Sequence, residues 1–463
     1  MNWSSFFPRL ALFILLGLFF TSAESPFAQG SKPANPSAHI AQSLPAHSPP
    51  ALSPSPDSAK PPAPPRTEQY TLSHDRYDKA IAYSRAGYTL YFVSSFAAIL
   101  VLYLFLRLRI AARFRDIAEN FTDNKWLQGI IFTPLLVGAA DLFDLPVRLY
   151  WHSLSLRYEQ SVQGWGSWLR DWALSEVLDI AFALVLVLII FALMRRSPRR
   201  WWFYSWLVVI PILVFFFFIT PWFIDPLFNK FEPLDAHHPE LVTAMEKIVQ
   251  RTGLNIPRDR MFLMHASAKT NALNAYVTGV GASKRVVVWD TTIQKSTIDE
   301  TLFIFGHESG HYVLGHVRNF FLFFAVLLFV VFYLLFRCLH WALDRWAVAW
   351  KIVGAEDWAA FAVLMLVLQI FVFISSPLVN GFSRIQEHEA DVFGLEVIHG
   401  IMPNSEEVAA HAFQVLGEVD LADPNPSPFI TFWLYSHPPV AERLVFAHTY
   451  DPWARGESPK YIK

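Results

Sequence analysis

The chain contains a single cysteine, Cys338, and few charged residues. One cysteine cannot form an internal disulfide or a cysteine-rich metal cluster, so histidine and carboxylate side chains would have to hold any bound metal. Charged residues make up 16% of the 463 residues, below the roughly 25% of an average soluble protein. Lys and Arg number 37 against 39 Asp and Glu, so there is no basic excess to bind a phosphate backbone. These absences argue against a soluble globular protein and against nucleic acid as a partner.

Apolar residues dominate instead, at 54% of the chain. Six segments are apolar enough, and nearly long enough, to cross a lipid bilayer, which takes about 20 helical residues. They lie at residues 88–106, 127–149, 173–194, 203–224, 320–336 and 359–379. The sequence therefore predicts a mainly α-helical, polytopic membrane protein with about six transmembrane helices.

The N-terminal part has a different composition. Arg9, an apolar run at residues 11–20 and small residues at 21–23 have the layout of a secretory signal peptide. Residues 1–23 are thus expected to be a signal peptide, or alternatively an uncleaved anchor. Residues 24–87 begin with a stretch rich in Pro, Ala and Ser, and we expect them to form a disordered Pro-rich tether.

Four acidic residues lie near the ends of the second and third apolar segments: Asp141, Asp144, Glu176 and Asp179. Ionisable groups at membrane depth must face protein or water, so these segments are expected to line an interior space. For Asp144 and Glu176, a position at the membrane interface is an equal alternative.

Residues 226–318, between the fourth and fifth apolar segments, have the pattern of a small α/β unit. A helix is expected at residues 239–250 with Gly253 as its stop, and strands at 261–264, 275–278 and 286–289. Gly279 and Gly281 suit a hairpin turn between the last two strands. Ser296 with Asp299 resembles an N-terminal cap, so a second helix is expected to start there.

This second helix contains the HExxH pattern, from His307 to His311. Residues four apart share a helix face, so both imidazoles can point at one zinc ion while Glu308 lies beside it. The glutamate can then take a proton from water that zinc has acidified, which produces a hydroxide able to attack a peptide carbonyl. The alternative is a surface helix with two histidines, but the motif follows an apolar stretch and ends just before a membrane span.

A zinc enzyme needs a third protein ligand, and the densest candidate cluster is residues 383–391, after the last apolar segment. Glu387 and Asp391 are four apart and share a helix face, so one can bind zinc while the other orients a ligand histidine. On the same helix, His388 and Glu389 would point elsewhere. Without the HExxH pattern, a charged helix beside the membrane would be the better interpretation.

His437 lies near the C-terminus and is followed by Pro438 and Pro439. A histidine presented rigidly by prolines suits the stabilisation of the oxyanion that forms when hydroxide adds to a carbonyl. From this segment alone, a loop histidine without a role is the alternative.

Together these patterns resemble the type I CAAX prenyl protease family, integral-membrane zinc metalloendopeptidases related to the HtpX-like heat-shock membrane proteases. Order and spacing match over roughly residues 145–444. The resemblance is carried by PLFNKF at 226–231 with Pro233 and Leu234, NAY at 274–276, KRVVVWDT at 284–291, GHESGH at 306–311 with Gly315 and His316, Asn380 with residues 383–391, and His437 with Pro438 through Arg443 and Leu444.

The resemblance implies a role for each matching residue. His307, His311 and Glu387 match the zinc ligands, Glu308 the general base and His437 the transition-state stabiliser; Asp391 and Arg384 match residues that support the ligands, and Asn274, Ala275, Tyr276 and Arg443 match substrate-binding positions. The resemblance also implies membrane helices around a water-filled chamber, with one zinc ion at its end in a zincin-like α/β domain. Eukaryotic members of the family trim prenylated CAAX proteins.

The sequence also departs from the family. Glu387 is followed by His388 and Glu389, where relatives usually carry an aromatic residue first, and residues 157–168 match the family's loop only loosely. The signal-like start and the Pro-rich tether are not typical either. These departures indicate a bacterial relative whose substrate need not be prenylated.

Basic residues give a prediction for the orientation in the membrane. Two short loops, after the first and third apolar segments, carry Arg107, Arg109, Arg113 and Arg115, and Arg195, Arg196, Arg199 and Arg200. The positive-inside rule places both loops in the cytoplasm and the HExxH region outside it. The family resemblance argues for the cytosolic face instead. We expect the extracytoplasmic face, because the two loops agree.

The sequence as a whole predicts a zinc metalloendopeptidase of the bacterial inner membrane that acts on a peptide or protein substrate, lipidated or not. Membrane helices 1–4 are expected in residues 88–225, a catalytic α/β domain in 226–318, membrane helices 5 and 6 in 319–380, and a C-terminal catalytic part in 381–463. The alternatives are a transporter or channel, which would make no use of HExxH, and a zinc-stabilised, non-catalytic membrane assembly factor.

Overall fold

The computed structural model describes residues 70–279 and 284–462. Within this part of the chain, six helical segments are long and apolar enough to cross a membrane, and each overlaps one of the six expected spans. They are α2 (His74–Arg107), α4 (Lys125–Arg157), α5 (Trp165–Arg196), α6 (Trp201–Ile219) with its continuation to Phe228, α11 (His316–Trp350) and α12 (Ala360–Ile398). The polytopic, mainly helical architecture is therefore confirmed. The expected signal peptide and residues 24–69 of the tether lie outside the described residues.

Several helices extend beyond the apolar segments. Residues 74–87, which we expected in the tether, form the first turns of α2, so that boundary was wrong. Tyr83 is 1% exposed and stacks on Trp151 of α4, with ring centroids 5.2 Å apart. This part of α2 is held by packing on one face, which average hydropathy does not reveal. A short helix α3 (Ile110–Phe121), which we did not expect, joins α2 to α4.

The acidic residues of the second and third spans are buried within the helix bundle. Arg148 of α4 pairs with Asp144 at 2.6 Å, with Glu176 of α5 at 3.0 Å and with Asp141 at 3.9 Å. An arginine that lies one helical turn after Asp144 thus offsets part of the acidic charge. The expectation that these carboxylates face the interior agrees with their burial.

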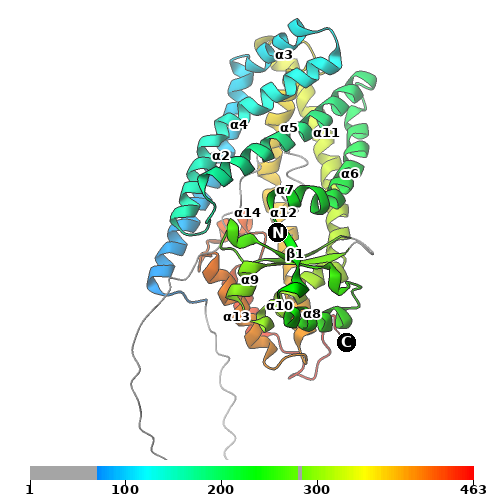
Figure 1. Cartoon of the computed structure of the whole chain (residues 1–463). Helices are drawn as coiled ribbons and strands as arrows, with labels where there is room; N and C mark the ends of the chain where they lie inside the picture. The colour runs from blue at the N-terminus through cyan, green and yellow to red at the C-terminus, as the bar shows by residue number, and fades with distance from the viewer. Residues whose placement is uncertain (1–69, 280–283, 463) are drawn as a thin grey trace, which may run out of the picture.

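A four-stranded sheet forms one layer of the domain below the membrane helices (Figure 1). Its strands are β1 (Phe231–Pro233), β2 (Met261–Met264), β3 (Ala275–Thr278) and β4 (Arg285–Trp289), in the order β1-β2-β4-β3. β2 runs parallel to β4, and β3 pairs antiparallel with β4 in the register Ala275 to Val288. The three expected strands are present, and β1 is an addition. Gly281, in the expected hairpin turn, lies outside the described residues.

Further helices complete the domain. They are α7 (Asp225–Phe228), α8 (Pro239–Thr252), α9 (Asp290–Lys295), α10 (Ile298–Val313), α13 (Ser405–Val419), α14 (Pro428–Leu434) and α15 (Val440–Thr449), with a π-helical turn at Thr220–Ile224 and 3₁₀ turns at Leu234–Ala236, Arg258–Arg260 and Ala266–Ala268. α8 ends at Gly253 as expected, with φ of +67°. The side chains of α8, α10, α13 and one face of the sheet, which includes Ala275 and Val286, form one core; the other face, which includes Tyr276 and Val287, packs into the core of the membrane helices.

The N-terminal cap of α10 lies one residue later than we predicted. Thr297, not Ser296, is the N-terminal cap: its hydroxyl accepts the Glu300 N–H at 3.3 Å, and the Glu300 carboxylate accepts the Thr297 N–H at 3.0 Å. This reciprocal pair satisfies two backbone donors that a helix start otherwise leaves open. Asp299 therefore does not take the role that we assigned to it.

The helices α10 and α12 approach each other closely at glycines. A Cβ at Gly394 of α12 would lie 2.9 Å from the backbone nitrogen of His307, and a Cβ at Gly306 of α10 would lie 3.3 Å from the Gly394 carbonyl oxygen. The two backbones can only come this close because neither residue has a side chain. Since α12 is one continuous helix from its apolar segment to Ile398, it carries residues 383–391 directly from the membrane span to α10.

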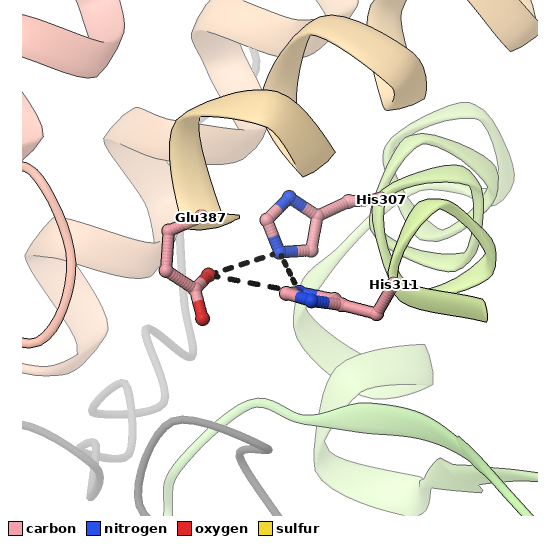
Figure 2. Close-up of side chains that lie close together, drawn as sticks. All are labelled: His307, His311 and Glu387. Atoms are coloured by element: carbon pink, nitrogen blue, oxygen red, sulfur yellow. Dashed lines mark hydrogen bonds and ion pairs between the residues drawn. The ribbon is translucent and has the colours of Figure 1, made fainter. Parts of the chain in front are cut away.

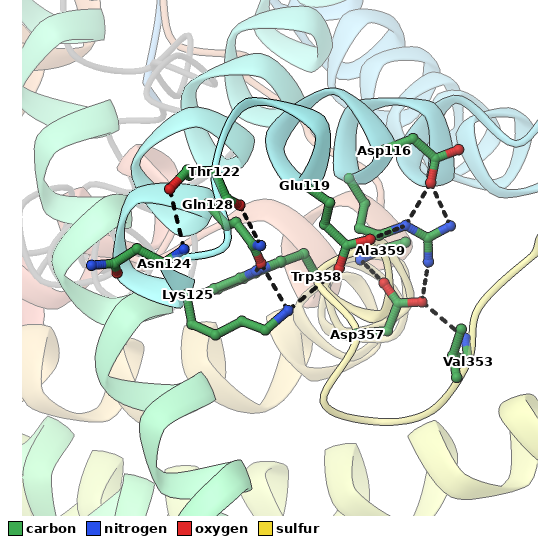
Figure 3. Close-up of polar contacts among 11 residues, drawn as sticks. Asp116, Glu119, Thr122, Asn124, Lys125, Gln128, Val353, Asp357, Trp358 and Ala359 are labelled. Atoms are coloured by element: carbon green, nitrogen blue, oxygen red, sulfur yellow. Dashed lines mark hydrogen bonds and ion pairs between the residues drawn. The ribbon is translucent and has the colours of Figure 1, made fainter.

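At the end of the bundle farthest from the sheet, polar contacts join α3, the start of α4 and the turn before α12 (Figure 3). The Arg115 side chain of α3 pairs with Asp357, in the turn before α12. Trp358 Nε1 donates to Gln128 Oε1 of α4 at 3.2 Å, and Lys125 Nζ donates to the same oxygen at 2.9 Å. These contacts fix α3 and α4 against the connection between α11 and α12.

Candidate metal centre

Three side chains from two helices converge on one buried point (Figure 2). His307 and His311 lie one turn apart on α10, and their Nε2 atoms are 3.3 Å apart. Glu387 comes from α12, and its Oε2 atom is 3.3 Å from His307 Nε2 and 3.8 Å from His311 Nε2. All three residues are less than 9% exposed. The structure thus brings together both histidines of the HExxH pattern and a carboxylate 76 residues after His311.

The donor atoms fit a zinc ion. Tetrahedral ligands at about 2.0 to 2.1 Å from zinc lie about 3.3 to 3.4 Å from each other, close to two of the three distances found here, and the third is 3.8 Å. Two imidazoles and one carboxylate are also a typical donor set for catalytic zinc, which leaves a fourth position open. A buried carboxylate oxygen beside two imidazole nitrogens is costly without a proton or a cation between them. The site is therefore suited to a divalent metal.

Asp391 lies behind this cluster. Its Oδ1 atom is 2.8 Å from His307 Nδ1, and Arg443 binds its two oxygens from the other side at 2.6 and 2.9 Å. Asp391 is 0% exposed. Of the two carboxylates that shared the predicted helix face, Glu387 thus points at the histidines and Asp391 at the ring edge of His307. Arg443, which we expected to contact substrate, is engaged by Asp391.

Burial and neighbouring charges set the protonation of the α10 residues. Burial lowers the pKa of His311 to about 3, so this ring is neutral and has a free lone pair at neutral pH. Burial also opposes protonation of His307, but the facing carboxylates of Asp391 and Glu387 outweigh it and raise the pKa of His307 to about 10.

Glu308 faces a cavity beside the cluster. The cavity has a volume of about 130 Å³ and is lined mainly by apolar side chains, with Glu308, Asn274, His437 and Asp420 among its polar residues. Glu308 Oε2 has no hydrogen-bond partner among the described residues. Burial raises the pKa of Glu308 to about 8. A carboxylate in this environment is a stronger base than an exposed one, because burial favours its protonated form.

His437 reaches the cluster from the segment between α14 and α15. Its Nε2 atom is 3.1 Å from Glu387 Oε2, and its side chain is 25% exposed. Arg384, which we expected beside the ligands, instead donates to the backbone oxygens of Thr431, at 2.9 Å, and of Tyr435. It therefore fixes the segment that leads to His437 and does not touch Asp391.

The predicted substrate-binding strand lies beside the cavity. β3 is at the edge of the sheet and pairs with β4 on one side only, and Asn274 directly before it lines the cavity. The Asn274 N–H donates to Thr292 Oγ1 at 2.7 Å, and its carbonyl oxygen accepts from the Trp289 N–H at 3.0 Å. Ala275 and Tyr276 are both buried, at 0% and 4% exposure.

Sequence reasoning missed three residues near the site. His316, for which the pattern suggested no role, is in contact with His311, and Glu389 is in contact with His316. The four-residue spacing on α12 could not reveal this, because Glu389 reaches across to a different helix. Asp420 lies on the wall of the cavity, and burial raises its pKa to about 8.

The chain is similar in sequence and fold to known membrane proteases. Two family models match: peptidase family M48 at residues 235–450, and the CAAX prenyl protease N-terminal model with five membrane helices at residues 58–230. The chain is 32% identical to an uncharacterised metalloprotease, YhfN, of Bacillus subtilis, over 71% of this chain and 75% of that one. It is 26% identical to a CAAX prenyl protease 1 homolog of Dictyostelium discoideum, again over 71% and 75%. The crystal structure of S. mikatae Ste24p has the same fold, with a TM-score of 0.71 at 23% identity over 84% of this chain and 93% of that one.

Proposed function

Since this chain belongs to peptidase family M48 and is a multi-pass membrane metalloprotease, we propose that it cuts peptide bonds with one zinc ion held by His307, His311 and Glu387. The observation that carries this proposal is the convergence of their three donor atoms in a buried site whose spacing fits zinc. Zinc held there supplies a Lewis acid that polarises the scissile carbonyl and acidifies water. The catalytic unit consists of residues 226–318 together with 381–463.

Glu308 acts as the general base in this proposal. It lies next to His307 in the sequence, faces the cavity and has a carboxylate oxygen free to take a proton from the attacking water. His437 lies across the cluster and stabilises the negative charge that develops on the carbonyl oxygen. Asp391 fixes the ring of His307, so that its Nε2 atom presents a lone pair to the metal.

The substrate is an extended peptide segment of a peptide or protein, lipidated or not. The edge position of β3 suits the addition of a substrate strand, with Asn274 to Tyr276 as the docking segment, because strand addition reads the backbone and leaves side-chain choice to the neighbouring cavity. The position of this domain at the end of six candidate membrane helices favours substrates that are attached to a membrane.

The test is Glu308→Gln in the purified full-length chain. We expect zinc content and thermal stability to stay close to those of the unchanged protein, while hydrolysis of a peptide library is lost. Glu407→Gln, an exposed glutamate on α13, is the matched control and should retain full activity. Full activity of Glu308→Gln would refute the base assignment.

A second substitution, Glu387→Gln, tests the ligand set. It should lower zinc occupancy at a fixed free zinc concentration, whereas Glu308→Gln should not. Unchanged metal content in Glu387→Gln would remove Glu387 from the ligands. The same preparation separates the rival functions, because neither a transporter nor a non-catalytic assembly factor would hydrolyse peptides in a chelator-sensitive manner.

We also propose that the catalytic domain lies on the extracytoplasmic side of a bacterial inner membrane. The arginine-rich segments after α2 and α5 lie at the end of the helix bundle opposite the sheet; there Arg195 lies over the ring of Trp358 at 4.5 Å and Arg115 pairs with Asp357. The positive-inside rule places this end in the cytoplasm. A reporter fused after Lys463 should be active only when exported; activity confined to the cytoplasm would overturn the orientation.

A further inference from the structure

The turn that follows the HExxH helix places a third buried histidine beside the metal centre. α10 ends at Val313, and Gly315 has a φ of +72°, in the left-handed region. Glycine adopts this conformation without the steric cost that other residues have. A new helix therefore starts after two residues, and His316, the first residue of α11, is 3% exposed beside the ring of His311.

Two hydrogen bonds link His316 to its surroundings. Its Nδ1 atom is 3.0 Å from His311 Nδ1, and its Nε2 atom is 3.2 Å from Glu389 Oε2. The rings of His311 and His316 are nearly perpendicular, at 73°, with centroids 5.1 Å apart. Glu389 belongs to α12, so this chain of contacts connects three helices: α10, the start of α11, and α12.

These contacts are consistent with one distribution of protons if His311 binds a metal. Its Nε2 atom faces the cluster and needs a free lone pair, so the ring proton must lie on Nδ1. That proton is donated to His316 Nδ1, and the proton of His316 then lies on Nε2 and is donated to the Glu389 carboxylate. The reverse arrangement would put a proton on His311 Nε2, where it would block the metal.

The two ligand histidines are thus supported in different ways. His307 faces the Asp391 carboxylate directly at 2.8 Å. We propose that His316, held by Glu389, is a positioning residue that fixes the ring orientation and tautomer of His311 for metal binding. This inference rests on the proposed function, because it takes His311 as a ligand. It explains why a glycine and a histidine follow the HExxH helix, and it gives Glu389 a role that the sequence pattern did not suggest.

The experiment measures metal binding by His316→Leu and His316→Asn in the full-length chain, purified in detergent. Zinc affinity is determined by competition with a chromogenic chelator, and the environment of the metal is followed by the visible absorption of bound Co²⁺. We expect His316→Leu to weaken zinc binding by about 10- to 100-fold and to change the Co²⁺ spectrum, because it leaves His311 Nδ1 without an acceptor. In His316→Asn, the side-chain oxygen can accept the same proton, so affinity should largely recover.

Two further variants control for loss of folding. Glu389→Ala removes the acceptor at the far end of the chain of contacts, at a side chain that is 37% exposed, and it should weaken zinc binding less than His316→Leu does. His388→Leu changes the adjacent histidine of α12, which packs on Phe446 with ring centroids 5.1 Å apart, and it should leave zinc affinity and the Co²⁺ spectrum unchanged.

The outcomes separate this inference from the proposed function. Wild-type zinc affinity and an unchanged Co²⁺ spectrum in His316→Leu would overturn the positioning role, and so would an Asn variant that binds as weakly as the Leu variant. If His316→Leu fails to fold, unchanged zinc affinity in Glu389→Ala would overturn the role. The proposed function is tested by a different result, namely the loss of hydrolysis in Glu308→Gln at full metal occupancy.

Discussion

The close approach of α10 and α12 at Gly394 makes this glycine a sensitive point for metal binding. A methyl group at this position would lie 2.9, 3.1 and 3.2 Å from the backbone nitrogen, Cα and Cβ of His307. Non-bonded carbon contacts are favourable at about 3.5 to 4.0 Å, so the helices must separate by roughly half an ångström. The atoms that clash belong to His307 itself, so the separation would move a proposed ligand directly.

We therefore expect Gly394→Ala to weaken zinc binding. Overpacking of this kind costs about 1 to 3 kcal/mol, and metal sites keep their ligand distances within about 0.2 Å. If most of this strain opposes the metal-bound geometry, the dissociation constant rises about 10- to 100-fold, since each 1.4 kcal/mol is a factor of ten. Peptide hydrolysis should recover partly at saturating zinc.

The assay compares zinc affinity of Gly394→Ala with that of Gly381→Ala in the purified full-length chain. Gly381 lies on the same helix, and the nearest atom to an added Cβ, Arg384 Nη2, is 3.7 Å away. Both substitutions raise helix propensity by a similar amount, so the control removes that effect from the comparison. Equal zinc affinities in the two variants would refute the claim that the glycine contact sets the distance between the ligands.

Three other predictions follow from buried charges. Arg443→Met leaves Asp391 buried without its partner, so it should destabilise the chain by about 3 kcal/mol and weaken zinc binding. Melting temperature and zinc competition check this, and a variant in which only KM changes would favour a substrate-binding role for Arg443. Burial raises the pKa of Asp420 from 3.8 to about 8, so the folded state keeps a proton that the unfolded state loses, and the stability of the fold decreases as pH rises between these values. Asp420→Asn should therefore raise the melting temperature at pH 8 much more than at pH 5, and equal increases at the two pH values would contradict the raised pKa. The fully buried Glu396 carboxylate accepts hydrogen bonds from the backbone N–H groups of Lys460, Tyr461 and Ile462, at 2.5 to 2.9 Å, so removal of the C-terminal tail from Lys460 onward should lower the melting temperature. An unchanged melting temperature would show that these hydrogen bonds contribute little to stability.

The membrane helices could be located from the sequence because a bilayer imposes a simple length and polarity requirement. Their ends could not, since the polar extensions are stabilised by packing. The first turns of α2 are held by Tyr83 against Trp151, and α12 runs past its apolar segment as one helix to Ile398. Hydropathy treats residues 383–391 as a separate charged segment, whereas in the structure they continue the last span.

The candidate site was more accessible to sequence reasoning than its surroundings. The spacing of His307 and His311 on a helix determines their relative position, and the four-residue interval from Glu387 to Asp391 limits the third ligand to one face. Which of these two carboxylates faces the histidines depends on how α12 crosses α10, and spacing within one helix cannot determine that. The crossing is set by Gly306 and Gly394, residues that bear no chemistry of their own.

Least predictable were the residues that contact Asp391 and His311, because each of them comes from a different segment of the chain. Asp391 is bound by Arg443 of α15, and His311 is contacted by His316 across the turn at Gly315. Arginine and histidine are ordinary choices for substrate contacts or surface positions, so residue type alone does not identify such roles. The distances do, because a buried imidazole that binds a metal through one nitrogen needs a defined acceptor for the proton on the other. A search for that acceptor around each ligand ring is therefore the step that converts a recognised motif into a description of its metal centre.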